Sequence, residues 1–195
     1  NSSMHKHLQD SITDGTYRYC NNNQCSYIKT NWWPDAVKET NIKHLRLAID
    51  DSCNLRCPSC RTGLIFVKSF AEYKKRIKLA DRINNWLSQV IHPVTVHIGS
   101  DGDPFASHVY RYFMAHTPKS KMLRYSILTN GLLVEEFHPK VPHVIENLQE
   151  LGVSIDGASK ETYEKLRLGG KWDNITRNLK CIADLKQKHN FKFSL

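Results

Sequence analysis

Residues 44–60 read HLRLAIDDSCNLRCPSC, and this stretch carries the strongest signals in the 195-residue sequence. Its first part, residues 44–50, is short, largely apolar and bounded by polar residues, which predicts a β-strand. Its second part holds Cys53, Cys57 and Cys60 in a C-x3-C-x2-C pattern. Three thiolates on one tight loop can bind three corners of a four-iron cluster, whose sites otherwise use four cysteines. The missing fourth ligand leaves one iron open to an outside molecule, as in a catalytic zinc site.

The sequence has three further cysteines, Cys20, Cys25 and Cys181. A total of six is compatible with three disulfides, but a chain of this length without an export signal does not need them. The alternative to an iron–sulfur cluster is a structural zinc ion bound by the triplet and completed by Cys20, Cys25 or His44. Cys181 lies beside the apolar stripe of a predicted helix, so we expect a half-buried structural thiol.

Strand-like and helix-like segments alternate along the chain from about residue 42. The predicted strands cover residues 44–50, 94–98, 125–129, 152–155 and 191–195. The predicted helices cover residues 70–90, 108–116, 142–151, 159–168 and 172–185. This alternation is typical of β-α-β units and a parallel sheet. The absence of a glycine-rich dinucleotide fingerprint favours a barrel or partial barrel. The near-continuous apolar strands predict a sheet that is covered on both faces.

Three local patterns predict details of these elements. Ser69 and Glu72 form an S-x-x-E capping box at the start of the first long helix. The densest basic run, Lys74–Lys78, is predicted to be a solvated face of that helix. His97, midway along the second strand, is expected to be a packing histidine rather than one that faces a substrate. Neither His97 nor the basic run is therefore assigned a function.

The composition is that of an ordinary globular protein, with 40% hydrophobic and 24% charged residues. No apolar run approaches the roughly 20 residues that a membrane-spanning helix needs. The N-terminus has no apolar signal-peptide core, so we expect a cytoplasmic protein with no membrane partner. The net charge of +9 makes nucleic acid a candidate partner without requiring it.

Polar and glycine-rich residues gather where the predicted strands end. These segments are Asp50–Cys60, Gly99–Pro104, Thr129–Gly131 and Ser154–Gly157. In parallel barrels the carboxyl ends of the strands lie at one face, and that face holds the chemistry. The sequence therefore predicts one site built from these four segments.

These motifs together resemble the radical SAM superfamily. Gly102-Asp103-Pro104 is similar to that family's G-G-E-P segment, and Thr129-Asn130-Gly131 resembles the T-N-G that closes its third strand. Val153–Gly157, with Lys160–Tyr163 and Arg167–Gly170, resembles the fourth-strand segment of members that carry SPASM-type auxiliary cluster domains. The resemblance implies a partial (β/α)6 TIM-like barrel of parallel strands.

On this basis we expect two parts in the chain. Residues 42–195 would form the radical SAM core, truncated in its fifth strand. Residues 1–41 would form an irregular N-terminal segment. Within it, Ser11–Cys20 and Cys25 resemble the tail of a SPASM-type module. The chain starts at Asn1 rather than at Met, which fits either a fragment or a processed chain. Because residues 1–34 look like the end of an earlier module and the barrel stops in its fifth strand, we expect a window on a longer protein.

The resemblance also implies roles for individual residues. Cys53, Cys57 and Cys60 would ligate a [4Fe-4S] cluster, and S-adenosylmethionine would chelate the open iron. The residues expected to contact S-adenosylmethionine are Asp101, Gly102, Asp103 and Pro104 at its amino group, Ser154 and Asp156 at its ribose or carboxylate, Arg167 at its carboxylate, and Asn130 on the cofactor or substrate side. Ser59, counted with these cofactor-binding residues, stands where the family often has an aromatic residue near the adenine.

The implied activity is radical chemistry. The cluster would donate one electron, split the sulfonium and yield a 5′-deoxyadenosyl radical that abstracts hydrogen from the substrate. The expected partners are a one-electron reductant such as a flavodoxin or ferredoxin, and a small-molecule or polypeptide substrate, for example a peptide, protein or sugar. The alternatives are an RNA-modifying radical SAM enzyme and a non-catalytic iron–sulfur or zinc module that binds nucleic acid. No general acid or base is predicted.

Overall fold

The computed structural model describes residues 3–21, 23–25, 28 and 41–194. The chain divides into two compact units, residues 1–40 and 41–195. In the first unit, helix α1 (Ser3–Thr13) is followed by turns that carry Cys20 and Cys25, both free thiols. The expectation of an irregular N-terminal segment is therefore wrong for α1. The end of that segment, residues 29–40, lies outside the described residues.

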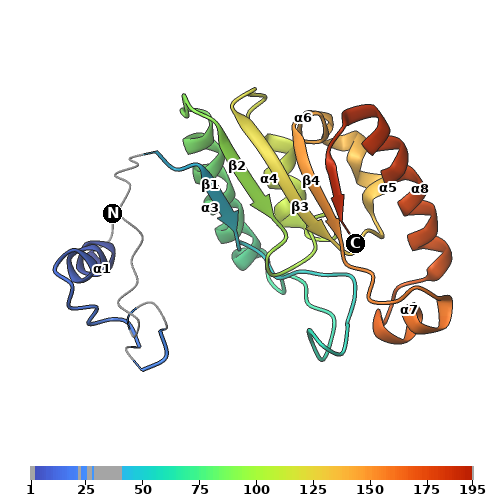
Figure 1. The fold of residues 1–195 in the computed structure, drawn as a ribbon, viewed down its shortest axis with the longest axis horizontal. Helices are drawn as coiled ribbons and strands as arrows, with labels where there is room; N and C mark the ends of the chain where they lie inside the picture. The colour runs from blue at the N-terminus through green and yellow to red at the C-terminus, as the bar shows by residue number, and fades with distance from the viewer. Residues whose placement is uncertain (1–2, 22, 26–27, 29–40, 195) are drawn as a thin grey trace. The chain divides into compact units, whose positions relative to one another are not determined.

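The second unit contains one sheet of five parallel strands in the order β1-β2-β3-β4-β5 (Figure 1). The strands are β1 (His44–Leu47), β2 (Val94–Ile98), β3 (Leu123–Thr129), β4 (Leu148–Val153) and β5 (Lys192–Ser194). Each connection steps to the neighbouring strand in the same direction, as in a barrel. A doubly wound sheet reverses its strand order instead. The predicted α/β fold with parallel strands is confirmed.

Helices follow the strands and cover one face of the sheet. They are α3 (Phe70–Leu87), α4 (His108–His116), α5 (Val134–Phe137), the 3-10 turn η1 (His138–Lys140), α6 (Pro142–Glu146), α7 (Lys160–Leu166) and α8 (Trp172–His189). Figure 1 shows α3 and α4 behind the strands. The apolar core lies between this helical layer and the sheet, and Phe113 of α4, Ile127 of β3 and Ile182 of α8 are all buried in it. None of the described helices is long and apolar enough to cross a membrane.

No helix of residues 41–194 covers the opposite face of the sheet. Along β2, Val94, Val96 and Ile98 are buried in the core, whereas Thr95 and His97 are only half-buried on the other face. The prediction of a sheet covered on both faces is therefore wrong. Polar residues alternate with apolar ones because this inner face is open to solvent in the described part of the chain.

Two element boundaries differ from the sequence prediction. β1 ends at Leu47 and not at residue 50, since the following residues turn into the cysteine loop. The helix predicted over residues 142–151 ends at Glu146, and β4 begins at Leu148. Leu148 pairs with Tyr125 of β3, with a register irregularity after that pair. Apolar residues from Leu148 onward, which local periodicity assigned to the predicted helix, thus belong to a strand because they pair with β3.

The start of α3 forms only half of the predicted capping box. The Ser69 hydroxyl accepts a hydrogen bond from the Glu72 main-chain N–H at 3.1 Å, as expected for an N-cap. The Glu72 carboxylate instead accepts from Arg76 one turn later, at 2.6 Å. That ion pair connects the helix start to the site described below.

Candidate functional site

The three cysteines of the triplet lie on the loop after β1. Cys53 and Cys57 are buried, Cys60 is exposed, and all three thiols are free. The Cys53 N–H donates to the Ile65 carbonyl at 2.9 Å, which holds the start of the loop against its return segment. Cys60 and Arg61 both donate their N–H groups to the Cys57 carbonyl, at 2.9 and 3.0 Å, and this turn brings the last two cysteines together.

Each cysteine sulfur has its own N–H donor. Cys53 Sγ accepts from the Leu55 main-chain N–H at 3.4 Å and from Asn130 Nδ2 at 3.7 Å. Cys57 Sγ lies 3.6 Å from Arg167 Nη1, and Cys60 Sγ lies 3.4 Å from Arg61 Nη2. Amide and guanidinium donors stabilise thiolates and cluster sulfurs in the same way. These donors favour the deprotonated, metal-bound form of the thiols, while burial opposes it at Cys53, whose pKa is raised.

The three thiols do not converge on one point as the ligands of a single zinc ion would. In the part of the chain that the structure describes, no three His, Cys, Asp or Glu side chains are placed to hold one metal ion. A cluster needs no such convergence, because its cysteines bind different irons. His44, the alternative zinc ligand, lies at the start of β1, and its Nδ1 is 3.2 Å from Nε2 of His97. That position is at the other end of the strand from the cysteine loop.

A cavity of about 140 Å³ adjoins the three cysteines. It is lined by residues from four strand ends, as the sequence predicts. Among the predicted cofactor-binding residues, those that line it are Asp101, Gly102, Asp103, Asn130, Ser154 and Arg167. Ser59, Pro104 and Asp156 are not part of its lining. Ser59 is exposed, and Asp156 lines a neighbouring pocket.

The Asp103 carboxylate is buried and fully occupied by the protein. One oxygen accepts from the N–H groups of Phe105 and Ala106, at 3.0 and 2.9 Å. The other accepts from the Thr129 hydroxyl and the Asn130 N–H, both at 2.7 Å. Burial raises the pKa of Asp103, and these four hydrogen bonds oppose that shift. The side chain joins the ends of β2 and β3. Both of its oxygens are therefore occupied, and neither is free for the amino group of S-adenosylmethionine, which the sequence analysis places at Asp101–Pro104.

Gly102 brings the loop after β2 into direct contact with the cysteine loop. A Cβ atom at this position would lie 2.5 Å from the Ser52 carbonyl oxygen and 2.8 Å from that of Asp50. The Asp103 N–H also donates to the Ser52 carbonyl at 2.9 Å. Only glycine allows the two main chains to approach this closely.

Asn130 holds the cysteine loop from the end of β3. Its Nδ2 donates to Asn54 Oδ1 at 2.8 Å as well as to Cys53, and its Oδ1 accepts from the Leu132 N–H at 3.1 Å. The side chain is buried at the cavity wall. Its hydrogen bonds orient a cluster ligand directly.

Arg167 lies between the cysteine loop and the end of β4. Its Nη2 forms an ion pair with Asp156 at 2.8 Å, while its Nη1 approaches Cys57. Asp156 holds this position with a left-handed backbone, at a φ of 59°. The Arg167 Nε atom is buried, and the described residues offer it no hydrogen-bond partner. The Arg167 side chain lines the cavity, and a guanidinium at its wall suits an anionic ligand group such as a carboxylate.

An ion-pair network under the cysteine loop was not predicted from the sequence. Asp50 is buried and receives hydrogen bonds from Arg76 of α3, from Ser107 at the start of α4 and from Ser52. Arg76 also contacts Asp51 at 2.9 Å, which lowers the pKa of that carboxyl group. Arg76 belongs to the basic run predicted to be a solvated face. That prediction is wrong for Arg76, because its side chain turns inward to a buried carboxylate.

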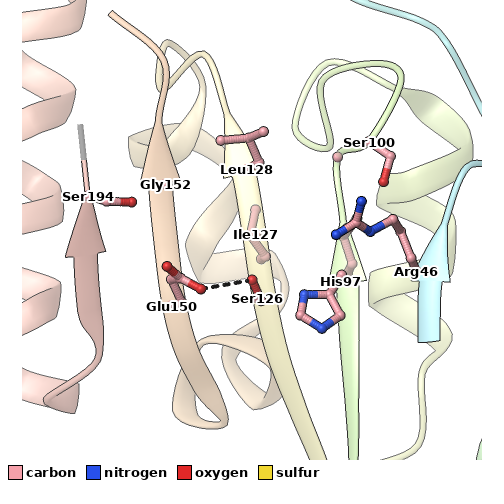
Figure 2. Close-up of a pocket in the computed structure, with 11 residues that line it drawn as sticks. Arg46, His97, Ser100, Ser126, Ile127, Leu128, Glu150, Gly152 and Ser194 are labelled. Atoms are coloured by element: carbon pink, nitrogen blue, oxygen red, sulfur yellow. Dashed lines mark hydrogen bonds between the residues drawn. The ribbon is translucent and has the colours of Figure 1, made fainter. Parts of the chain in front are cut away.

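The inner face of the sheet carries a second pocket, of about 440 Å³ (Figure 2). One row across the strands places Arg46, His97, Ser126 and Glu150 side by side in register. Ser126 Oγ lies 3.4 Å from a Glu150 carboxylate oxygen. The pocket shares Gly99, Ser100 and Leu128 with the cysteine cavity, so the two spaces adjoin at the strand ends; these shared residues belong to both linings.

His97 faces this inner pocket and not the helical core, so its prediction as a packing histidine is wrong. Its ring stacks on that of His44, with centroids 5.4 Å apart. Burial, and then the charges of His44 and Arg46, lower the pKa of His97, while Glu150 opposes the shift. Cys181 is half-buried, as predicted.

Comparison with known proteins identifies the family of this site. A model of the Radical SAM superfamily matches residues 49–194, from the end of β1 to β5. The chain belongs to the radical SAM superfamily. Radical SAM membership agrees with the sequence resemblance and decides for an enzyme against a non-catalytic iron–sulfur or zinc module. It also implies a [4Fe-4S] cluster and S-adenosylmethionine as cofactors.

The relatives of this radical SAM chain are distant. A GTP 3',8-cyclase of Synechocystis sp. is 23% identical over 155 residues, which are 79% of this chain and 44% of the relative. A probable GTP 3',8-cyclase of Methanococcus maripaludis is 24% identical over 145 residues, 74% of this chain and 46% of the relative. A solved structure, native anSMEcpe with bound AdoMet, is 17% identical with a TM-score of 0.45, covering 78% of this chain and 43% of that one. The chain thus spans less than half the length of these relatives.

Proposed function

We propose that the chain binds a [4Fe-4S] cluster through Cys53, Cys57 and Cys60 and uses it to cleave S-adenosylmethionine reductively, abstracting hydrogen from a substrate. The observation that carries this proposal is the cavity of about 140 Å³ that the three cysteines line together with Arg167. When bound, the cluster supplies one electron and S-adenosylmethionine supplies the hydrogen-abstracting group. The protein residues bind, orient and shield these groups.

Two charged side chains suit the amino-acid end of S-adenosylmethionine. The Arg167 guanidinium lines the cavity and would pair with the carboxylate. We assign the ammonium group of S-adenosylmethionine to the Asp101 carboxylate and not to that of Asp103, because Asp101 is exposed at the cavity wall. Main-chain carbonyls of the same segment complete this side of the site.

The substrate would lie on the inner face of the sheet, in the pocket of about 440 Å³ next to the cysteine cavity (Figure 2). Arg46 and Glu150 give this pocket groups of both charges, and His97 and Ser126 add neutral hydrogen-bonding groups. Such a lining favours a polar substrate, such as a peptide or sugar, over an apolar one. The names of the curated relatives add GTP as a second candidate substrate.

The test is anaerobic reconstitution of the full-length gene product with iron and sulfide, followed by dithionite reduction and an assay for 5′-deoxyadenosine. We expect about four irons per site and S-adenosylmethionine cleavage that is lost in a Cys53→Ser, Cys57→Ser, Cys60→Ser triple variant. A Cys181→Ser variant is the matched control and should keep both. One tightly bound zinc ion in place of the cluster would refute the proposal.

The assay for 5′-deoxyadenosine also tests the class of substrate. Added peptide, sugar, GTP or RNA is compared for its ability to raise the yield of 5′-deoxyadenosine. Stimulation by a peptide or sugar supports the proposed class, whereas stimulation by GTP alone favours a nucleotide substrate. RNA binding that weakens steeply with salt, together with stimulation by RNA, would instead support the RNA-modifying alternative.

A further inference from the structure

Arg61 directly follows the last cysteine of the triplet and contacts it. Its Nη2 donates to Cys60 Sγ at 3.4 Å and to the Asp101 carbonyl oxygen at 3.1 Å. Its Nη1 donates to the Asp51 carbonyl oxygen at 2.9 Å. The guanidinium therefore bridges the cysteine loop, the end of β1 and the loop after β2. All three acceptors are neutral carbonyls or sulfur.

Arg61 acts on one carboxylate only at a distance: its charge helps to lower the pKa of Asp51, whose direct ion pair is with Arg76. Among the described residues, Arg61 forms no ion pair with an Asp or Glu side chain, unlike Arg76 and Arg167. Burial lowers the pKa of Arg61, but the hydrogen bond to Cys60 and the charges of all three thiolates outweigh it and raise the pKa. The positive charge thus acts on the three thiols of the triplet as well as on Asp51.

We propose that Arg61 is a positioning residue that raises the reduction potential of the [4Fe-4S] cluster by holding against Cys60 an N–H donor and a positive charge that forms no ion pair with a described carboxylate. Reduction transfers one electron from an external reductant to the cluster, which gains one negative charge, and no covalent bond forms or breaks. A nearby cation stabilises the more negative, reduced form. Hydrogen bonds to cluster sulfurs act in the same direction.

This role is separate from that of Arg167. The Arg167 guanidinium is paired with Asp156, so its charge is shared with that carboxylate. Arg61 has no such ion pair among the described residues. Its contribution to the potential is therefore expected before S-adenosylmethionine binds.

The inference rests on the proposed function, because it requires a cluster at the three cysteines. The test is a redox titration of the reconstituted full-length protein without S-adenosylmethionine, followed by EPR of the reduced cluster. For Arg61→Gln we expect the ratio of reduced to oxidised cluster at a given potential to fall about tenfold, which is a 59 mV lower midpoint for a one-electron couple. Arg61→Lys keeps the charge and should recover more than half of this shift.

Arg56→Gln is the matched control. Arg56 lies on the same loop but is exposed, and the structure describes no hydrogen bond or ion pair of its side chain. Its removal should leave the midpoint unchanged. Iron and sulfide contents are measured for every variant, and circular dichroism checks that each is folded.

An unchanged midpoint in Arg61→Gln with a full cluster would overturn the inference. So would loss of the cluster from a folded Arg61→Gln variant, because Arg61 would then serve only to hold the loop. If that variant does not fold, Arg61→Lys decides, since a midpoint more than about 30 mV below wild type, half of the shift expected for Arg61→Gln, contradicts a role for the charge and a smaller shift supports it. Failure of the wild-type protein to bind a cluster would refute the proposed function itself, which separates the two failures.

Discussion

Asp101 and Asp103 each have a carboxylate side chain and lie two residues apart, but they differ in burial and therefore in role. Asp103 is only 2% exposed and accepts four hydrogen bonds from the ends of β2 and β3. Asp101 is exposed at the cavity wall. A buried carboxylate that accepts four donors cannot exchange them for a ligand without leaving those donors unpaired. Binding and stability are therefore separated between the two side chains.

Substitution of each aspartate by asparagine tests this separation. Asp103→Asn places an amide N–H₂ group against protein donors and should lower the free energy of unfolding by about 3 kcal/mol. Asp101→Asn should leave stability unchanged and weaken S-adenosylmethionine binding about tenfold. Urea unfolding and calorimetric titration of the reconstituted protein measure the two effects. Equal destabilisation by both variants would contradict the assignment.

His97 is the titrating group of the inner pocket. Its pKa lies below the usual 6.5 because of burial and the charges of His44 and Arg46. Glu150→Gln should lower it further and Arg46→Gln should raise it, as read from the ring signals of His97 in an NMR pH titration. Because the unfolded chain binds this proton more readily, stability should fall as the pH drops from about 6.5 through the folded-state pKa. A His97 pKa that neither substitution moves would show that these charges do not reach its ring.

At the scale of elements, the site forms where several loops meet, and no single loop or strand builds it alone. The loop after β2 touches the cysteine loop at Gly102, and Asn130 at the end of β3 holds Cys53. Helix α3 supplies Arg76 to Asp50 beneath the same loop. The cysteine loop is thus positioned by three elements, none of which contributes a cluster ligand.

Gly102→Ala tests the closest of these contacts. The added methyl group would meet main-chain carbonyl oxygens at 2.5 and 2.8 Å, which cannot yield as a flexible side chain would. We expect a loss of stability of about 1–3 kcal/mol and a lower iron content after reconstitution. Gly63→Ala, on the same cysteine loop but with open space around it, is the control and should change neither. Full iron loading of a stable Gly102→Ala protein would mean that the loops can separate without harm to the site.

At the scale of the whole molecule, the chemistry is confined to one of two units. All three triplet cysteines, and every described residue that lines their cavity, belong to the unit of residues 41–195. Cys20 and Cys25 belong to the other unit, where they are free thiols. Two cysteines cannot supply the ligands of a four-iron cluster by themselves.

We therefore expect a Cys20→Ser, Cys25→Ser double variant to keep the iron of the triplet and its cleavage of S-adenosylmethionine. Iron analysis and the 5′-deoxyadenosine assay measure this against the wild-type protein. Loss of about four irons, with the triplet still loaded, would instead show that these cysteines help to hold an auxiliary cluster.

The sequence by itself determined the cysteine triplet, the α/β alternation and the strand ends at which the site lies. These features depend on spacing along the chain, since a short loop sets its own ligands and a strand or helix has its own period. Tertiary structure decided which polar groups remain free for ligands. Asp103 meets Asn130 and Asp50 meets Arg76 only because the sheet and α3 pack together. Such contacts between distant segments, together with the burial that makes them strong, arise on folding, so no local pattern could show that Asp103 is occupied or that Arg61 faces a cluster ligand.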